Sequence, residues 1–584
     1  MSTGVRRVAA GRTAVAAMLL VSAVLPAACT GVPRSGAPEI VQSVGVEEPQ
    51  QPVVTPQDGL DPRGIVQGFL ANNAANDEHH SAARAFLTPE EKSRWSDTSG
   101  AVIVDHLQIG VFTDDTVTIS GHQIGSLDST GAYKPSLPGD GTGGGGAPLQ
   151  EPIGLKKVDG QWRIDTPLQQ GLVLTATQFT QYYGAPKSIY FLDQSEQRLV
   201  PAPRYTALTD PGLLANWLMS QLIAQPSSLS SALPSVPTGT PVKVSTDGQT
   251  IVVDLPGASQ LATATKNLMA AQVALTLDQA DHNARMRITD GGQPVVIPQI
   301  GSATFDADQF RAEYIPAPRS PDLYYVNGGA VYDDAAKPMP GSLGNASNDL
   351  TSVALATSSS SSRLLVAGTT GPSSDAKLLV GQAGTALHTT SVHGELSRPA
   401  WAPDVDEVWI GDGGALYRLN DQGHAARVPI SAPNATPSGR ITSVRFSPEG
   451  ARVSLVIAGA DGRGQLWIGT VARAPTSVSV TGLAQVSPNG VSVSDAAWND
   501  QSLLMAVGHD VNTGDPGVYE VHADGSLWTP LGIGNLPPGL DSITVAPGTV
   551  AAVSAGGTVW VQSNGTWAGL GDGTTYGNNP VYVE

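Results

Sequence analysis

The sequence predicts a multidomain protein with an N-terminal α+β domain, a second α/β domain and a C-terminal all-β propeller of five to seven blades. Two observations carry this prediction. Helix starts and strand-like runs alternate up to about residue 300, and from about residue 320 a strand-rich unit recurs every 44 to 53 residues. The chain of 584 residues is long enough for each domain to bury a core of its own.

The composition excludes one class of partner. The formal net charge is -19, only 14% of the residues are charged, and no run of Lys and Arg interrupts this pattern. Such a surface repels the phosphates of nucleic acids, so we expect no nucleic-acid partner. The 66 glycines and 44 prolines also suit strands and turns better than helical bundles.

Residues 1–28 have the pattern of a lipoprotein signal peptide. Three arginines, an apolar run over 13–25 and small residues before a cleavage site follow one another in this order. The apolar run is too short to span a hydrocarbon core of about 30 Å comfortably. Removal of the segment takes away its three arginines, so that the formal net charge of -19 becomes -22.

Cys29 directly follows this segment and is the only cysteine of the chain, so no internal disulfide can form. Its setting resembles the lipobox of bacterial lipoproteins, although Pro26 stands where leucine is usual and Leu25 lies one place earlier. The resemblance implies an S-diacylglycerol and N-acyl cysteine, with palmitate among the chains, and two or three acyl chains hold a protein firmly on a membrane. The alternative is an ordinary signal peptide with an incidental cysteine. A flexible linker, rich in proline and glycine, is predicted over 29–60.

The first domain is predicted over 61–183. Asp61 and Pro62 form a helix start, and the apolar residues of 65–70 fall on one helical face. We expect a second short helix over 81–87, then strands over 101–109 and 115–121. Asp159 and Gly160 join two alternating runs as a hairpin. Helices followed by a sheet indicate an α+β domain, for which an NTF2-like cone is a candidate fold.

The second domain is predicted over 187–300. Strands are expected at 188–192 and 198–200, and Asp210 with Pro211 begins a helix. Asp247 and Gly248 join a further hairpin. A long helix is expected over 257–279, and short strands around 290–292 close the unit.

The third domain is predicted over 320–584, where five similar cores follow one another at 351–368, 397–412, 442–459, 494–508 and 541–557. Each core contains two strands around a turn, and most are followed by another strand. A period in the forties with three or four strands per unit is typical of propeller blades. A sixth blade could combine residues 323–332 with the C-terminal tail and so close the ring.

The search for chemistry leaves few candidates. The motifs G-x-S-x-G, H-E-x-x-H and G-x-x-x-x-G-K-S/T do not occur. Asp77, Glu78, His79 and His80 could hold a metal, but adjacent histidines point apart and a solvated turn is favoured. We therefore expect no catalytic residues, no metal and no cofactor.

Two further groups have an ordinary interpretation and a functional one. Asp404, Asp406 and Glu407 lie near a blade turn, where solvated charges are favoured over a glycosidase carboxylate pair. Six tryptophans recur at blade positions, where packing between blades is favoured over a binding face. They are Trp401, Trp409, Trp467, Trp498, Trp560 and Trp567.

The order of several motifs resembles the actinobacterial LpqB lipoprotein family. These motifs are CTGVPRSGAPEI from Cys29, DPRGIVQGFLANNA from Asp61, KKVDGQWRIDTPLQQGLVL from Lys156, and LPSVPTGTPVKV with VVDLPG in the second domain. The last two are similar to the GerMN module, and the repeats are similar to the C-terminal propeller of the family. The resemblance implies a protein that is anchored to the outer face of the cell membrane.

The resemblance also implies a partner, the extracellular domain of the sensor histidine kinase MtrB. Binding is expected to modulate signalling through the Mtr two-component system, with effects on the cell envelope and on division. Cell-wall components are a further candidate partner. The main alternative is a cell-wall hydrolase or carbohydrate-binding lipoprotein, which a cluster of converging carboxylates would favour. A solute-binding lipoprotein is a third class, but it would need two doubly wound lobes in place of the repeats.

Overall fold

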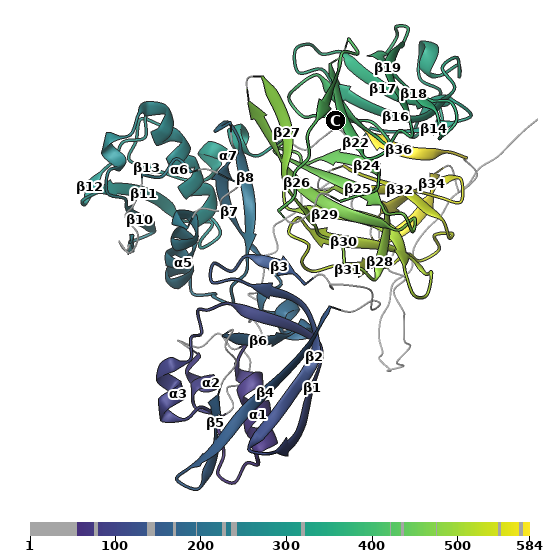
Figure 1. The fold of residues 1–584 in the computed structure, drawn as a ribbon. Helices are drawn as coiled ribbons and strands as arrows, with labels where there is room; N and C mark the ends of the chain where they lie inside the picture. The colour runs from purple at the N-terminus through teal and green to yellow at the C-terminus, as the bar shows by residue number, and fades with distance from the viewer. Residues whose placement is uncertain are drawn as a thin grey trace, which may run out of the picture. The chain divides into compact units, whose positions relative to one another are not determined.

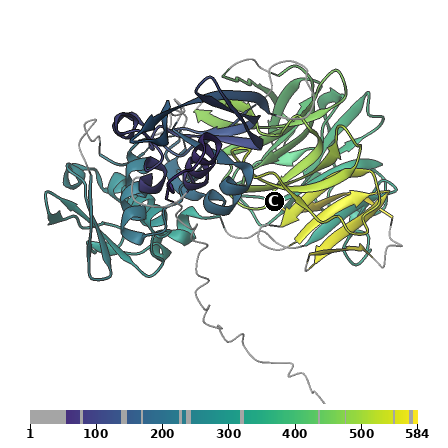
Figure 2. The ribbon, with the colours of Figure 1, turned by 90° about the horizontal axis from the view of Figure 1, so that it is seen from below.

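The computed structural model describes residues 55–584 with the exception of short segments, and residues 51–584 form one compact unit. The segments left out are 75–79, 137–145, 167–170, 194, 225–228, 230, 235–241, 317–321, 421, 434–436, 475, 547–549, 564 and 571–575. The predicted signal peptide, Cys29 and most of the predicted linker lie outside the described residues. Figures 1 and 2 show the chain from two directions.

The N-terminal domain begins with three helices. Helix α1 (Pro62–Asn72) starts where predicted, because the side chain of Asp61 accepts a hydrogen bond from Gly64 N at 2.7 Å. Its apolar face is buried in the domain core. Helix α2 (Ser81–Arg84) is shorter than predicted, since the chain turns into an isolated bridge at Leu87, and α3 (Pro89–Arg94) follows the cap Thr88.

A sheet with the strand order β5-β4-β2-β1-β6 covers these helices. Its strands are β1 (Ala101–Thr113), β2 (Thr116–Leu127), β3 (Tyr133–Pro135), which pairs with β2, β4 (Ala147–Val158), β5 (Gln161–Thr166) and β6 (Leu172–Thr175). Asp159 and Gly160 have φ values of 51° and 81° and form the predicted turn between β4 and β5. The domain ends with α4 (Ala176–Gln178) and a π-helical turn (Phe179–Tyr183). This order confirms the predicted α+β fold.

The second domain combines a hairpin with a separate mixed sheet. The hairpin consists of β7 (Lys187–Leu192) and β8 (Leu199–Arg204), and α5 (Pro211–Ile223) follows the predicted cap Asp210. The sheet contains β9 (Lys243–Asp247), β10 (Thr250–Asp254), β11 (Arg285–Asp290), β12 (Gln293–Pro294) and β13 (Thr304–Phe305). Strands β10 and β11 are parallel, and α6 (Thr263–Leu277) connects them. The core also includes Phe310 of α7 (Asp308–Tyr314).

The prediction of a long helix over 257–279 is wrong for residues 257–262. Gly257 adopts a φ of 88°, a 3-10 turn spans Ala258–Gln260, and Leu261 is extended. The helix α6 starts only at Thr263. The apolar positions 261, 268 and 275 all come after this turn, and their spacing did not show that the helix begins only at Thr263.

The C-terminal domain is a propeller of six blades, a number within the predicted range. Blades 2 to 6 have four strands each and follow one another along the chain. Blade 2 consists of β16 (Leu350–Thr357), β17 (Leu364–Thr370), β18 (Ala376–Gln382) and β19 (His388–Gly394), and blade 3 of β20 (Ala400–Trp401), β21 (Glu407–Asp412), β22 (Ala415–Asn420) and β23 (Ala425–Val428). Blade 4 consists of β24 (Arg440–Phe446), β25 (Arg452–Ala458), β26 (Gly464–Ala474) and β27 (Ser477–Gln485), blade 5 of β28 (Val491–Trp498), β29 (Leu503–Asp510), β30 (Pro516–His522) and β31 (Thr529–Leu531), and blade 6 of β32 (Leu540–Ala546), β33 (Val550–Ala555), β34 (Thr558–Ser563) and β35 (Thr566–Gly569).

Blade 1 is built from both ends of the domain, as predicted. The last strand, β36 (Asn578–Tyr582), pairs with β14 (Leu323–Asn327), which pairs with β15 (Ala330–Asp333). In Figure 1 the yellow β36 therefore lies among the teal strands β14 and β16. Beyond β36, the backbone of Glu584 exchanges hydrogen bonds with Leu355 and Thr357 of blade 2, at 2.8 and 2.9 Å. The ring is thus closed by hydrogen bonds between its first and last segments.

Four of the six blade tryptophans confirm the packing interpretation, and Trp467 and Trp560 are partly buried. Trp401, Trp409, Trp498 and Trp567 are buried. The indole of Trp401 in blade 3 donates to Ala354 O in blade 2 at 3.2 Å, and that of Trp498 in blade 5 donates to Ser454 Oγ in blade 4 at 3.2 Å. These large side chains therefore hold neighbouring blades together.

Candidate functional site

Of the candidate metal residues, only His80 lies within the described part of the chain. It stands at the start of α2 with a left-handed φ of 48°, and its ring centroid lies 6.2 Å from that of Trp95. Among the described residues, no group of three or more His, Cys, Asp and Glu side chains could hold a metal ion. The same residues contain no helix that is long and apolar enough to cross a membrane.

The structure gives Asp404 and Asp406 different partners. Asp404 is exposed and lies 3.5 Å from Arg198, measured between Oδ2 and Nη2. Asp406 accepts hydrogen bonds from the serine loop of blade 2, including Ser358 Oγ at 2.8 Å and Ser359 N at 2.8 Å. Burial alone would raise the pKa of Asp406, but these hydrogen bonds lower it below its ordinary value. Asp406 therefore connects blades 2 and 3 as an ionised group.

Glu407 is held between two guanidinium groups. Its oxygens accept from Arg418 at 2.5 Å and from Arg473 at 2.8 Å. Burial raises the pKa of Glu407, and the hydrogen bond and charge of Arg473 together with Arg418 more than reverse this effect. A general acid of a glycosidase needs a raised pKa. The geometry at Asp406 and Glu407 thus favours structural ion pairs over the carboxylate pair of a hydrolase.

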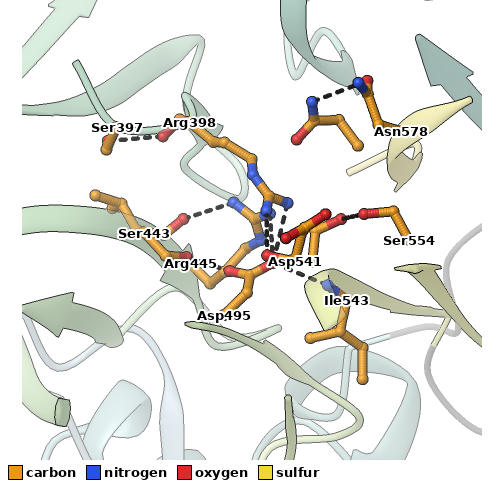
Figure 3. A network of polar contacts seen from close by, with 12 residues as sticks. Ser397, Arg398, Ser443, Arg445, Asp495, Asp541, Ile543, Ser554 and Asn578 are labelled. Carbon is orange, nitrogen blue, oxygen red and sulfur yellow. Dashed lines mark hydrogen bonds and ion pairs between the residues drawn. The ribbon is translucent and has the colours of Figure 1, made fainter. Parts of the chain in front are cut away.

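The most connected polar cluster lies where the inner strands of four blades meet, and sequence reasoning missed it. We call it the axial network: the side chains of Arg398, Ser443, Arg445 and Asp495 with the backbone of Asp541 and Ile543. Figure 3 shows both guanidinium groups converging on the carboxylate of Asp495. Because Asp495 lies on β28 of blade 5 with no exposed surface, every one of its contacts is made inside the protein.

Three hydrogen-bond donors and a second guanidinium group reach the Asp495 carboxylate. Ser443 Oγ donates to Oδ1 at 2.5 Å, and Ile543 N and Arg398 Nη1 donate to Oδ2 at 3.0 Å each. Arg445 Nη2 lies 3.6 Å from Oδ2. These donors come from blade 4, blade 6 and the segment that enters β20 of blade 3, so one carboxylate connects four blades.

The electrostatics follow from burial and from the two cations. Burial raises the pKa of Asp495, but the charges of Arg398 and Arg445 outweigh burial and hold the pKa below its ordinary value. Burial also lowers the pKa of Arg398, which the charge of Asp495 offsets in part. Arginine nevertheless stays protonated in proteins. Asp495 is therefore ionised, and both of its carboxylate oxygens accept hydrogen bonds. This arrangement suits a structural role in holding the blades together and not proton transfer.

The repeats contained a signal for this network. Ser352, Ser443, Asp495 and Ser542 all follow a register shift near the start of an inner strand. Three of these equivalent positions hold serine and one holds aspartate, while arginine occupies buried inner segments at 398 and 445. The repeats alone do not show this, because Val444 can be matched with either Ala496 or Ala497, whereas strand pairing matches it with Ala496. Two consecutive alanines gave no means to choose between them.

Three protein-family models match the chain, one for each of the three domains. The model of the LpqB N-terminal domain matches residues 55–180, that of the LpqB β-propeller domain matches 329–583, and a model described as "Sporulation and spore germination" matches 188–296. Lipoprotein LpqB of Mycolicibacterium smegmatis is 31% identical over 461 residues, which cover 74% of this chain and 77% of that protein. The chain belongs to the LpqB lipoprotein family.

Other LpqB proteins extend the match. Lipoprotein LpqB of Nocardia farcinica is 28% identical over 600 residues, covering 95% of each chain. That of Mycobacterium tuberculosis is 29% identical over 472 residues, covering 76% of this chain and 78% of the other. LpqB membership accounts for the GerMN-type module between the other two domains, as the motifs had indicated.

Solved structures resemble this LpqB-family chain only distantly. TolB from Acinetobacter baumannii is 14% identical with a TM-score of 0.33, and the match covers 48% of this chain and 70% of TolB. A chain of the nidogen/laminin complex is 10% identical with a TM-score of 0.34, and the match covers 44% of this chain and 97% of the other. Both scores are too low to support any conclusion about function.

Proposed function

We propose that this LpqB-family lipoprotein is held by acylated Cys29 on the outer face of the cell membrane, where it binds the extracellular domain of the sensor histidine kinase MtrB. It modulates signalling through the Mtr two-component system by binding and not by catalysis. The observation that carries the proposal is membership of the LpqB family over nearly the whole chain.

The described structure supports a binding role in physical terms. The axial network and the closing strand β36 fix six blades in one ring, so the propeller offers a preorganised surface that needs little ordering on association. Asp406 and Glu407 are engaged in ion pairs and hydrogen bonds. These features favour a protein-binding module over the alternative of a cell-wall hydrolase.

Anchoring would make even a weak interface effective. Two proteins in one membrane meet at a raised effective concentration, so a modest affinity suffices. The protein could change kinase output only by binding two kinase states with different affinities, because equal binding shifts no equilibrium.

Two measurements on membranes test the proposal together. The kinase should co-purify with the wild-type chain from detergent-solubilised membranes, and phosphorylation of the regulator MtrA should change when the protein is deleted. The matched control is the Cys29→Ala chain, which should leave the membrane fraction and lose most of the kinase. Failure of the wild-type chain to retain the kinase, with unchanged regulator phosphorylation on deletion, would contradict the proposal.

A further inference from the structure

The N-terminal sheet carries an apolar patch that faces water. We call it the hairpin patch: Val111 and Phe112 at the end of β1, and Trp162 near the start of β5. Val111 is 79% exposed and Phe112 is 36% exposed. Among the large apolar side chains that are exposed in the described part of the chain, these are the only two that are adjacent in sequence.

The patch is built and held in place by its surroundings. The pairing of β1 with β2 shifts register between Ile109 and Phe112, which reorients the side chains at the end of the hairpin. The rings of Phe112 and Trp162 meet edge to face with centroids 5.0 Å apart, and Lys157 Nζ lies 5.2 Å from the Trp162 ring centre. An ordered aromatic pair beside an exposed valine is the kind of surface that anchors a partner.

A residue close to the start of the described chain contacts the strand of the patch. Gly59 N donates to Gln161 Oε1 at 2.9 Å, and Gln161 is the neighbour of Trp162. Residues from 55 on are described, and this contact places Gly59 beside the strand that carries Trp162.

The charges beside the hairpin patch favour a protein over a lipid surface as its binding partner. The exposed carboxylates of Asp114, Asp115 and Asp159 occupy the turns beside the patch and outnumber the ammonium group of Lys157 at the Trp162 ring. Anionic headgroups of a bacterial membrane would repel these carboxylates. An apolar pocket edged by lysine or arginine side chains would complement both the rings and the carboxylates.

We infer that the hairpin patch is a docking surface for such a pocket on the extracellular domain of a membrane protein. The inference rests on the proposed function, in which that protein is the sensor kinase. It adds the surface and its chemistry: Val111, Phe112 and Trp162 fill the pocket, and the three carboxylates face basic side chains at its edge.

The test uses the full chain in detergent micelles and the purified extracellular domain of the kinase as the probe. The Val111→Ser, Phe112→Ser double variant should bind about tenfold more weakly, as expected for loss of a buried anchor. Val296→Ser is the matched control, because Val296 is 56% exposed on the second domain and should leave binding unchanged. Thermal unfolding should show that both variants remain folded.

A second experiment reverses the charges of the turn between β1 and β2. Asp114→Lys with Asp115→Lys should weaken kinase binding severalfold, and the difference from wild type should shrink as salt rises. In a parallel experiment, the Cys29→Ala chain is mixed with vesicles of equal parts phosphatidylglycerol and phosphatidylethanolamine. It should not bind them.

The outcomes separate this inference from the proposed function. Kinase binding by wild type that is unaffected by the hairpin-patch substitutions would overturn the inference and leave the proposed function intact. Vesicle binding that the Val111→Ser, Phe112→Ser substitutions abolish would also overturn it, because the occupant would then be the bilayer. No kinase binding by wild type would overturn both.

Discussion

Asp495 contributes directly to stability, because its buried carboxylate receives donors from three other blades. Asp495→Asn would leave Arg398 and Arg445 without their counter-charge in a buried site, and we expect a loss of about 3–5 kcal/mol in the free energy of unfolding of the propeller. Denaturant titration followed by tryptophan fluorescence measures this, since seven of the ten tryptophans lie in the propeller. Asp515→Asn, on the exposed end of the same blade, should cost less than about 0.5 kcal/mol.

The same carboxylate predicts a pH dependence. Because the folded-state pKa of Asp495 is depressed, its contribution to stability is fully present above the ordinary aspartate value of 3.8 and is lost as the pH falls through the lower folded value. The wild-type propeller should therefore lose stability as the pH falls below about 4. Asp495→Asn should lose less over this range, and equal losses in both proteins would contradict the assignment.

At the scale of elements, β36 decides whether the ring closes. Deletion of residues 578–584 would remove the inner strand of blade 1 and the backbone hydrogen bonds of Glu584 to blade 2. We expect the propeller to lose its cooperative unfolding transition while the N-terminal domain keeps its own, as limited proteolysis would show. Removal of residue 584 alone should have a much smaller effect. A sharp transition of unchanged midpoint in the longer deletion would show that closure does not depend on β36.

The elements also show where sequence reasoning succeeds and where it stops. Asp61-Pro62, Asp210-Pro211 and Asp159-Gly160 act through local backbone geometry, so the sequence predicted these helix starts and this turn correctly. The start of α6 was misplaced, because a turn at Gly257 and an extended Leu261 precede the helix and the apolar spacing does not reveal them. Repeat spacing likewise predicted the blades and the mixed closing blade, since each blade repeats the same strand pattern.

The axial network could not be predicted in the same way. Arg398, Ser443, Asp495 and Ile543 are separated by tens of residues and meet only because four inner strands approach one axis. A single sequence shows an aspartate among serines at equivalent positions, but not which arginine reaches it. The hairpin patch is a similar case, because exposure of Val111 depends on a register shift that no local motif indicates.

At the scale of the whole molecule, anchoring and docking should be separable. Cys29→Ala leaves the folded domains unchanged, so its affinity for the purified kinase domain in solution should match that of wild type within about twofold. In cells, its association with the kinase should fall strongly, because the shared membrane no longer raises the effective concentration. Equal association of both proteins in cells would argue against a role for the acyl chains. Binding assays in solution and quantitative pull-downs from cells provide the two numbers.

The central claim is that this lipoprotein contacts the sensor kinase on the outer face of the membrane. In-cell cross-linking followed by mass spectrometry tests it most directly, because it requires neither purification nor signalling output. The account predicts cross-links between the N-terminal domain, around Lys157, and the extracellular domain of the kinase, and their loss in the Cys29→Ala chain. A cross-link map rich in other envelope proteins but without any kinase peptide would contradict it.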